Sequence, residues 1–328
     1  MPTVLISPGP LRGKAGAFRE ILRAGGFDDF IDPEGDTTLT EDVLRATLPR
    51  ADAMLAGSEP LTGELFDLAP RLRAIARTGV GYDAVDVPAA TARGIPVLIT
   101  PGTNQESVAE QAFSLLLGVS RDVANNDRTI KEGGWSRVLP QPLRGRTLGL
   151  VGLGRIGRAV AVRAIAFGMK VVAFDPMPDP AFDALHGVTR VGFEALLATA
   201  DVVSLHLPLT ADTRGLFNKN VFARMRPGSI LLNTSRGGLV VEAELYDALQ
   251  SGRLFGAGLD VLNSEPPDAS NPLLTLPNVV LSPHLGGIDT KGMSDMADMA
   301  ASCIVALSQG RWPSGCVVNE EIAPGWKW

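Results

Sequence analysis

The sequence predicts an α/β fold made of two domains, each built on a parallel sheet. Three observations lead to this prediction. Short apolar runs alternate with helical patterns over the first hundred residues, a Gly-x-Gly-x-x-Gly turn stands between a strand and a helix at 147–175, and further strand-like runs follow it. Two cores are possible because the chain has 328 residues, of which 45% are hydrophobic and 20% charged.

The first domain shows strand-like and helix-like segments in alternation. We expect helices near Ala17–Ala24 and Thr62–Leu68, and strands at Val4–Ile6, Ala53–Ala56, Leu72–Ala76 and Pro96–Ile99. Most neighbouring strands are separated by a helix-length segment rather than by a hairpin turn, so the sheet is predicted to be parallel. A long helix is then expected over about 104–126, and we interpret it as a bridge between the domains.

The segment Thr147–Asp175 has the pattern of a dinucleotide-binding unit. An apolar strand precedes the glycine turn, and an amphipathic helix that Gly168 can end follows it. Gly152 would permit the tight turn, Gly154 would let the backbone approach a pyrophosphate, and Gly157 would let the helix pack closely on the strand. Asp175 would end the second strand and hydrogen-bond the ribose hydroxyls. Because its charge would repel a 2′-phosphate, the predicted cofactor is NAD rather than NADP.

Further segments complete the second sheet and return the chain to the first domain. Strands are expected at Val202–Leu207, Ile230–Asn233, Ala257–Asp260 and Val279–Leu281, which makes a doubly wound sheet. The helical pattern at Asp289–Leu307 carries methionines that we interpret as core residues, and it is expected to fold back onto the first domain. For the tail at 323–328, with Trp326 and Trp328, a flexible end and docking on a partner subunit both stay open.

Composition argues against several classes of function. The net charge is −6 with both signs interspersed and without a long basic run, so no nucleic-acid partner is expected. No run of 18 apolar residues occurs and the first residues do not resemble a secretion signal, so neither export nor membrane anchoring is expected. Cys303 and Cys316 are too few for a disulfide framework and lack metal-ligand spacing, which favours a reducing cytoplasm and predicts no metal site.

Three chemical groups at successive strand ends suggest a reaction. Arg236, Glu265 and His284 follow the last three predicted strands of the nucleotide-binding sheet, at the edge where such sheets bind ligands. Arg236 could hold a carboxylate and polarise a carbonyl. His284 could give or take a proton near neutral pH, and Glu265 could orient its ring. This set predicts hydride transfer between a nicotinamide and a small keto acid.

An ordered series of motifs resembles the D-isomer-specific 2-hydroxyacid dehydrogenase family over nearly the whole chain. The motifs are Gly79-Val-Gly-Tyr-Asp-Ala-Val-Asp86, Thr100-Pro-Gly-Thr-Asn104, Ser107-Val-Ala-Glu110, Gly152-Leu-Gly-Arg-Ile-Gly157, His206-Leu-Pro-Leu-Thr210, Asn233-Thr-Ser-Arg-Gly-Gly-Leu-Val240, Gly258-Leu-Asp-Val261, Glu265-Pro-Pro267 and Pro283-His-Leu-Gly-Gly287. The resemblance implies two Rossmann-like or flavodoxin-like domains with a cleft between them. It places residues 1–101 and 289–328 in a substrate domain, and 102–288 in an NAD-binding domain.

The resemblance also implies roles for individual residues. Arg236, Glu265 and His284 match the family's catalytic residues. Residues implied to contact the cofactor are Gly152, Gly154, Arg155, Ile156, Gly157, Asp175, His206, Pro208, Thr213, Thr234, Ser235, Asp260 and Gly286. Residues implied to contact the small anionic 2-keto or 2-hydroxy acid are Arg77, Val80, Gly81, Asn104 and Arg236.

Two departures and two alternatives bear on the function. Glu59 stands in a segment where phosphoglycerate-handling members tend to carry an arginine, which argues against a phosphorylated substrate, and Val241 replaces an Asp or Asn that is usual after Gly-Leu-Val. The alternatives are phosphite (phosphonate) oxidation with the same three groups, and an NAD(H)-sensing, corepressor-like regulator.

A homodimer is implied by the resemblance, with the helix after Asn104 at its interface.

Overall fold

The computed structural model describes residues 1–328, and the chain divides into two compact units. The first unit comprises Met1–Asn104 and Asp289–Trp328, and the second comprises Gln105–Ile288. The first boundary therefore falls a few residues after the position expected at 101.

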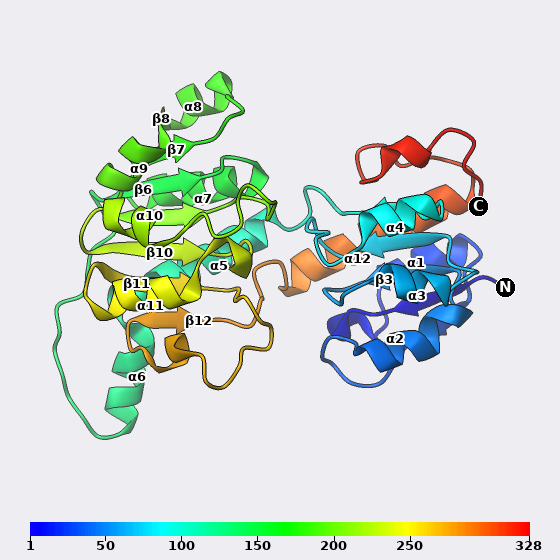
Figure 1. Ribbon diagram of the computed structural model, residues 1–328, viewed down its shortest axis with the longest axis horizontal. Coiled ribbons are helices and arrows are strands. Elements are labelled where there is room, and N and C mark those ends of the chain that lie inside the picture. The colour runs from blue at the N-terminus through cyan, green and yellow to red at the C-terminus, as the bar shows by residue number, and fades with distance from the viewer. The chain divides into compact units, whose positions relative to one another are not determined.

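The first unit contains a five-stranded parallel sheet with helices on both faces (Figure 1). Its strand order is β2-β1-β3-β4-β5, with β1 Thr3–Ile6, β2 Asp29–Ile31, β3 Ala53–Ala56, β4 Ala74–Arg77 and β5 Val97–Leu98. The helices are α1 Ala17–Ala24, α2 Glu41–Thr47, α3 Gly63–Asp67, α4 Val87–Ala92 and α12 Thr290–Ser308. Successive strand residues face opposite layers: Val4 and Ile6 pack in the core with α1 and α12, whereas Leu5 packs with α2, α3 and α4.

The C-terminal segment packs on its own first unit. Asp289 caps α12 through the N–H groups of Lys291 and Gly292, and the methionines of that helix lie in the core beside β1 and β3. The Nε1–H of Trp326 donates to the carbonyl of Gly94 at 2.8 Å, and the ring of Trp328 meets Phe27 edge to face with centroids 5.5 Å apart. The tail is therefore not free: it packs on the first unit of its own chain.

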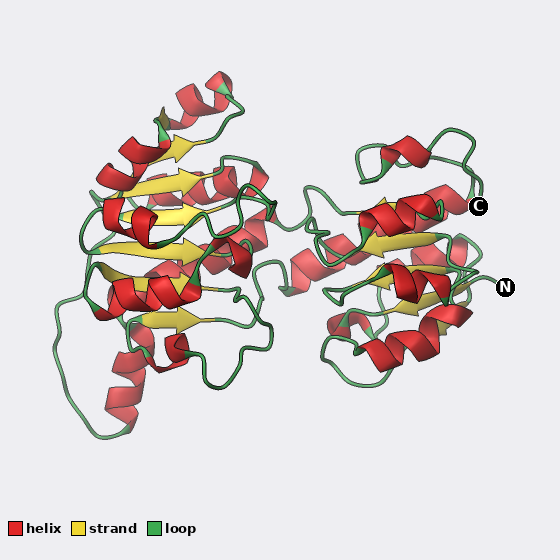
Figure 2. Cartoon of the chain, in the orientation of Figure 1, coloured by secondary structure: helices red, strands yellow, loops and turns green.

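The second unit contains a seven-stranded parallel sheet in the order β12-β11-β10-β9-β6-β7-β8, again covered on both faces (Figure 2). The strands are β6 Thr147–Val151, β7 Lys170–Phe174, β8 Thr189–Arg190, β9 Val202–Leu205, β10 Ser229–Asn233, β11 Leu254–Leu259 and β12 Val279–Leu281. The helices are α5 Gln105–Arg121, α6 Val123–Lys131, α7 Arg155–Ala166, α8 Pro180–His186, α9 Phe193–Thr199, α10 Lys219–Arg224 and α11 Glu242–Gln250. The order reverses between β6 and β9, which is where such sheets bind dinucleotides.

The helix predicted over 104–126 differs from the structure in two ways. It is broken at Asp122, whose φ of 54° is left-handed, so that α5 ends at Arg121 and α6 forms a separate helix. It also belongs to the second unit rather than bridging the domains, because Leu115, Leu116 and Val119 are buried in that unit's core. The periodicity continued past Asp122 and could not reveal this break.

No helix in the chain is long and apolar enough to cross a membrane.

Candidate active site

The predicted catalytic and cofactor residues all follow strands that end at one edge of the second unit's sheet. Parallel neighbouring strands bring their carboxyl ends to the same edge, so the order β7-β6-β9-β10-β11-β12 determines which residues are neighbours. The glycine turn Gly152–Gly157 follows β6, and Asp175 follows β7. The loop after β9 carries His206, Pro208 and Thr213, and the turn after β10 carries Thr234–Arg236. The loop after β11 carries Asp260 and Glu265, and the loop after β12 carries His284 and Gly286.

The structure gives a different answer at each of the three glycines of the turn after β6 to the question of why a glycine stands there. Gly152 has a φ of 100°, and a Cβ on it would lie 2.4 Å from the carbonyl oxygen of His206. A Cβ on Gly157 would lie 2.4 Å from the carbonyl oxygen of Gly152, so both glycines are required by the fold itself. Gly154 has an ordinary φ of −71° and nothing within 4 Å of a Cβ, so the chain itself gives no reason for a glycine there.

The open space in front of Gly154 fits a pyrophosphate. Gly154 is the N-cap of α7 without a side-chain cap, and the N–H groups of Arg155 and Ile156 find no acceptor in the chain. Unpaired N–H groups and the positive end of the helix dipole together bind anions. Arg155 itself is exposed.

Asp175 is held in place by backbone groups on both of its carboxylate oxygens. Oδ2 accepts the N–H of Leu153 at 2.6 Å, and Oδ1 accepts the N–H of Met177 at 2.7 Å. Each oxygen keeps a further lone pair, so the carboxylate can still accept ribose hydroxyls. No arginine directly follows Asp175 in the sequence, but the fold brings Arg190 to its loop. That side chain donates to the carbonyls of Asp175 and Met177 and pairs with Asp183 at 2.8 Å, so its role here is to hold the loop.

His206 is a neutral group at the β6–β9 reversal. Burial lowers the pKa of its imidazole to about 4. Its Nε2 lies 2.9 Å from the hydroxyl of Ser204, whereas Nδ1 is buried without a hydrogen-bond partner in the chain. An unpaired nitrogen beside the glycine turn is available to a ligand.

Three hydroxyl side chains lie in the loops after β9 and β10. Two of them bind backbone carbonyls, and the third has no hydrogen-bond partner. The Thr213 hydroxyl donates to the carbonyl of Pro208 at 2.7 Å, and the Ser235 hydroxyl donates to that of Leu205 at 2.8 Å. Thr213 and Ser235 thus shape their own loops. Thr234 is 8% exposed and its hydroxyl has no partner, so it is the side chain in this group that is available to a cofactor.

Asp260 organises the loop that carries His284. Its carboxylate accepts hydrogen bonds from the Ser282 hydroxyl at 2.5 Å, from Leu285 N–H at 2.9 Å and from Gly286 N–H at 2.7 Å. Asp260 is 1% exposed, so these bonds satisfy a fully buried charge. The resemblance implied that Asp260 and Gly286 contact the cofactor, and in the structure their hydrogen bond also supports the loop of His284.

His284 and Glu265 form a pair whose geometry suits proton transfer. His284 Nδ1 lies 2.6 Å from Glu265 Oε2, while Glu265 Oε1 accepts the N–H of Leu262 at 3.1 Å. Because the carboxylate takes Nδ1–H, the ring presents Nε2 outward. Both side chains are 38% exposed, so a substrate can reach the ring.

Arg236 acts electrostatically on the same pair. Burial opposes ionisation of Glu265, but the hydrogen bond and charge of His284, the Leu262 N–H and the charge of Arg236 outweigh it and lower the pKa of Glu265. Glu265 is therefore a carboxylate at neutral pH. Arg236 NH1 donates to the carbonyl of Ser235 at 2.7 Å, which anchors the guanidinium at the end of β10.

The predicted substrate contacts other than Arg236 lie in the first unit, at the carboxyl edge of its sheet. Arg77 ends β4, is 7% exposed and donates through Nε to the carbonyl of Gly81 at 3.0 Å. The backbone N–H groups of Val80 and Gly81 find no acceptor in the chain, as expected of a turn that can receive a carboxylate. Asn104 is the last residue of this unit's first segment and is 8% exposed.

Two supporting residues were missed by the sequence reasoning. Asn233 is fully buried at the end of β10, where it accepts the N–H of Ser235 and donates to the carbonyl of Arg236 at 2.8 Å, so it folds the turn that presents Arg236. Gln111 on α5 donates to the Ser282 hydroxyl at 2.8 Å, which in turn donates to Asp260. Asn233 begins a motif that was recognised, but nothing in the sequence separation indicated Gln111.

A family model described as "D-isomer specific 2-hydroxyacid dehydrogenase, NAD binding domain" matches residues 113–286, just over half of the chain. The chain is 45% identical over 291 residues to the D-3-phosphoglycerate dehydrogenase of Mycobacterium leprae, covering 86% of this chain and 55% of that protein. It is 43% identical over 271 residues to the glyoxylate reductase of Korarchaeum cryptofilum, covering 81% of each.

Among solved structures, the TT0316 protein of Thermus thermophilus superimposes with a TM-score of 0.86 at 39% identity, covering 96% of this chain and 99% of that one. The chain spans about half the length of the first curated relatives that it matches.

Proposed function

Because the chain belongs to the D-isomer-specific 2-hydroxyacid dehydrogenase family and has its NAD-binding domain, we propose that it interconverts a small 2-keto acid and the D-2-hydroxy acid. The observation that carries this proposal is the pair formed by His284 and Glu265, 2.6 Å apart, with the charge of Arg236 acting on it. These groups follow β10, β11 and β12, three neighbouring strands.

His284 is proposed as the acid in reduction and the base in oxidation. NADH, when bound, supplies the hydride that adds to the keto carbon. The proton for the oxygen comes from Nε2–H of His284, because Nδ1 is engaged by Glu265. In the reverse direction the same nitrogen takes the hydroxyl proton. Glu265 is ionised and fixes the ring, so it contributes orientation and charge.

Arg236 is proposed to bind the substrate's carboxylate and to polarise its carbonyl. A guanidinium is charged at any relevant pH and offers several N–H donors in a plane, which suits an anionic substrate. Of the predicted contacts in the first unit, the free N–H groups of Val80 and Gly81 and the buried Arg77 have the chemistry of a carboxylate receptor. Those contacts, and that of Asn104, stay predictions.

The cofactor is proposed to lie along the edge from Asp175 to Thr234. The open N–H groups of Arg155 and Ile156 would hold the pyrophosphate, and Asp175 would hold the adenosine ribose. Asp175 argues for NAD over NADP because its carboxylate would face a 2′-phosphate. The unpaired Nδ1 of His206 and the Thr234 hydroxyl are the two buried polar groups left for the cofactor.

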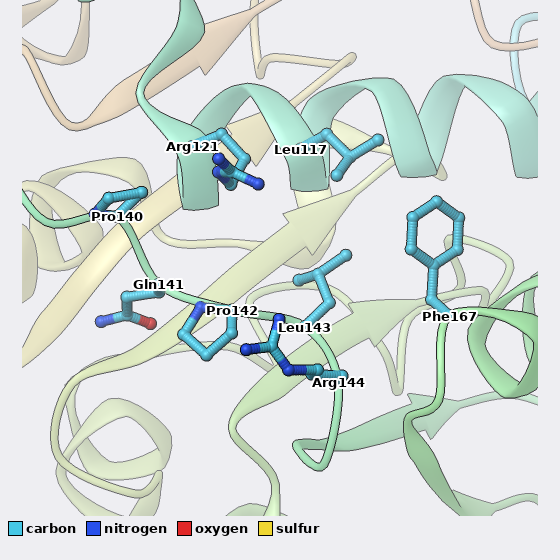
Figure 3. A pocket seen from close by; sticks show the side chains of 8 residues that line it. All are labelled: Leu117, Arg121, Pro140, Gln141, Pro142, Leu143, Arg144 and Phe167. Atoms are coloured by element: carbon cyan, nitrogen blue, oxygen red, sulfur yellow. The ribbon is translucent and has the colours of Figure 1, made fainter.

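A homodimer is proposed, with the end of α5, the helix after Asn104, and the segment that follows it in the contact. Helix α6 buries none of its residues, and the loop after it exposes three large apolar side chains, namely Trp135 at 76%, Val138 at 73% and Leu139 at 92%. Exposed apolar groups in such density favour a protein contact. Beside the end of α5, Leu117 and Phe167 line an open pocket of about 500 Å³ that a second copy could fill (Figure 3).

Consumption of NADH over a panel of acceptors tests the proposed reaction. Glyoxylate, hydroxypyruvate and 3-phosphohydroxypyruvate are offered with NADH, and phosphite is offered with NAD in a separate arm. We expect reduction of at least one keto acid and no oxidation of phosphite. NAD reduction by phosphite alone would replace the proposal with phosphite oxidation, and NADH binding without any turnover would point to a regulator.

A cytoplasmic location, expected from the two cysteines, stays a proposal.

A further inference from the structure

The loop that carries Asp175 is held by a side chain from the neighbouring strand. Arg190 in β8 pairs with Ala173 in β7, two residues before Asp175, so its side chain starts close to that loop. Its Nη1 donates to the carbonyl of Met177 at 3.1 Å and to that of Asp175 at 3.3 Å. One guanidinium nitrogen thereby binds both ends of the turn formed by residues 175–177.

The same guanidinium fastens helix α8 to this loop. Helix α8 lies at the same end of the second unit as β7 and β8 (Figure 1). Arg190 Nε lies 2.8 Å from Asp183 Oδ2, and the two side chains are only 23% and 15% exposed. An ion pair that is largely shielded from water is stronger than an exposed one. Arg190 is therefore a fixed donor rather than a mobile surface charge.

A second arginine joins α8 to the glycine turn. Arg158 on α7 donates through Nε to the carbonyl of Leu153 at 3.1 Å, and its Nη1 lies 2.6 Å from Asp179 Oδ2. Asp179 is the N-cap of α8, where Oδ1 accepts the N–H of Phe182. The Arg158 guanidinium also lies 5.3 Å from the centre of the Phe182 ring. Ion pair, hydrogen bond and ring contact together fix this side chain.

The carboxylate of Asp175 connects the two segments that these arginines hold. Its Oδ2 accepts the N–H of Leu153, and Arg158 binds the carbonyl of that residue. Its Oδ1 accepts the N–H of Met177, and Arg190 binds the carbonyl of that residue. Each carboxylate oxygen is thus directed by a backbone segment that an arginine fixes in turn. We call Arg158 and Arg190 the arginine clamp.

We propose that the arginine clamp preorganises Asp175 for the adenosine ribose of the cofactor, and that it acts through this carboxylate without touching the cofactor. This inference rests on the proposed place of the ribose at Asp175. A carboxylate whose direction is set before binding loses little conformational entropy when two hydroxyls approach it. Without the clamp only part of the molecules would hold Asp175 in the binding direction, and the apparent affinity would fall by that fraction.

The clamp should matter for only one half of the cofactor. Asp175 follows β7, whereas His284, beside which the hydride is proposed to react, follows β12 at the other end of the sheet order. ADP-ribose contains the adenosine half without the nicotinamide, and reduced nicotinamide mononucleotide contains the reacting half without the adenosine. The affinity for the first should depend on the clamp, and the reaction of the second should not.

Binding of ADP-ribose to the full chain tests the clamp without turnover. Calorimetric titration gives the dissociation constant for the wild type, Arg190→Leu, Arg158→Leu and the control Arg253→Leu. Arg253 likewise donates to backbone carbonyls, three of them at the end of α10, but it directly precedes β11 and therefore lies at the opposite edge of the same sheet. The control removes the same kind of support far from the cofactor.

Arg190→Leu should raise the dissociation constant of ADP-ribose at least about tenfold, and Arg158→Leu, whose side chain is more exposed, at least about fivefold. Arg253→Leu should leave it within about twofold. The KM for NADH should rise with the dissociation constant, whereas kcat/KM with reduced nicotinamide mononucleotide should stay within about twofold in both clamp variants. Arg158→Leu tests the clamp independently if Arg190→Leu does not fold.

A double-mutant cycle separates positioning from direct contact. Asp175→Ala removes the carboxylate that the clamp directs, so adding Arg190→Leu to it should raise the dissociation constant of ADP-ribose by less than about twofold. A further tenfold rise would show that Arg190 acts on the cofactor itself or on the fold alone, and would overturn the inference.

Wild-type affinity for ADP-ribose in both Arg190→Leu and Arg158→Leu would also overturn the inference, as would an equal loss in Arg253→Leu. A wild type that does not bind ADP-ribose would instead refute the proposed place of the cofactor, and the inference with it.

Discussion

The carbonyl oxygen of Asp260 accepts the backbone N–H of His284 at 2.8 Å, while the carboxylate of Asp260 holds the residues on either side of it. His284 has a φ of 55°, in the left-handed region that residues other than glycine seldom adopt. A strained conformation of this kind persists where the surroundings determine it, and functional sites are where it is found. Asp260 thus holds the backbone of His284, while Glu265 orients its ring.

Replacing Asp260 with Asn should therefore impair both stability and turnover. One acceptor oxygen becomes an NH₂ group, which faces either the N–H of Gly286 or the N–H of Leu285 and the Ser282 hydroxyl. Either way a buried N–H donor is left unpaired, at a cost of about 1–3 kcal/mol. We expect kcat to fall at least about tenfold, because His284 loses its support. Urea unfolding and kinetics at saturating NADH measure the two effects, and an Asp260→Asn enzyme with wild-type values of both would contradict this role.

Gly154→Ala should separate cofactor binding from folding. Nothing in the chain lies within 4 Å of the new Cβ, so the midpoint of unfolding should stay close to that of the wild type. The methyl group would occupy the space offered to the pyrophosphate, and NADH affinity should fall at least about tenfold. Calorimetric titration measures the NADH affinity, and thermal unfolding measures the midpoint of unfolding.

Two other glycines are the controls for that variant. Gly192→Ala adds a methyl group that is equally free of contacts, away from the turn, and should change neither quantity. Gly152→Ala should destabilise the protein, because its φ is 100° and the carbonyl of His206 is 2.4 Å from the new Cβ. Unchanged NADH affinity in Gly154→Ala would show that the cofactor does not approach this residue.

His206 should make the stability of the protein depend on pH. Its pKa is about 4 in the folded protein and near the ordinary 6.5 when unfolded, so between these values the unfolded chain binds more protons. The contribution is fully present above pH 6.5 and is lost progressively as the pH falls toward 4, by up to about 3 kcal/mol. Urea unfolding at pH 7.5 and 5 should therefore show a smaller loss for His206→Gln than for the wild type. His186→Gln, with a partly exposed side chain, is the control, and an equal loss in all three proteins would contradict the assignment.

The exposed loop after α6 should govern the oligomeric state. Trp135 and Leu139 are 76% and 92% exposed in the single chain, and we expect a second copy to cover them. Changing both to Glu should shift the protein from dimer to monomer in sedimentation velocity without unfolding it. Met177→Glu changes a similarly exposed apolar side chain, at 75%, on another loop of the same unit, and should leave the dimer intact. A wild-type monomer at micromolar concentration would refute the dimer.

Much of the architecture could be predicted from the sequence because its signals are local. The strand–turn–helix unit around Gly152–Gly157 and the apolar runs of β9, β10 and β12 have lengths and spacings that only a covered parallel sheet explains. The three catalytic candidates were found because each follows one of the predicted strands, β10, β11 and β12. The break at Asp122 was missed, because a helical pattern continues on both sides of a single left-handed residue.

The support of the site could not be predicted, because it depends on contacts between distant segments. Asp260 was expected beside the cofactor, yet its hydrogen bonds to Leu285 and Gly286 join two different strand ends. Gln111 reaches Ser282 from a helix far earlier in the chain. Neither spacing nor residue type indicates such pairs. The neighbouring strands β11 and β12 bring the first pair together, and the packing of α5 on these strands brings the second.

The most direct test of the account is the turnover of His284→Asn. Asn tolerates the left-handed backbone at φ 55°, so the loop should keep its shape while the imidazole is removed. We expect kcat for keto acid reduction at saturating NADH to fall at least about a hundredfold, with the dissociation constant of NADH within about threefold of the wild type. A kcat within about threefold of the wild type would contradict the assignment of His284 as the proton donor.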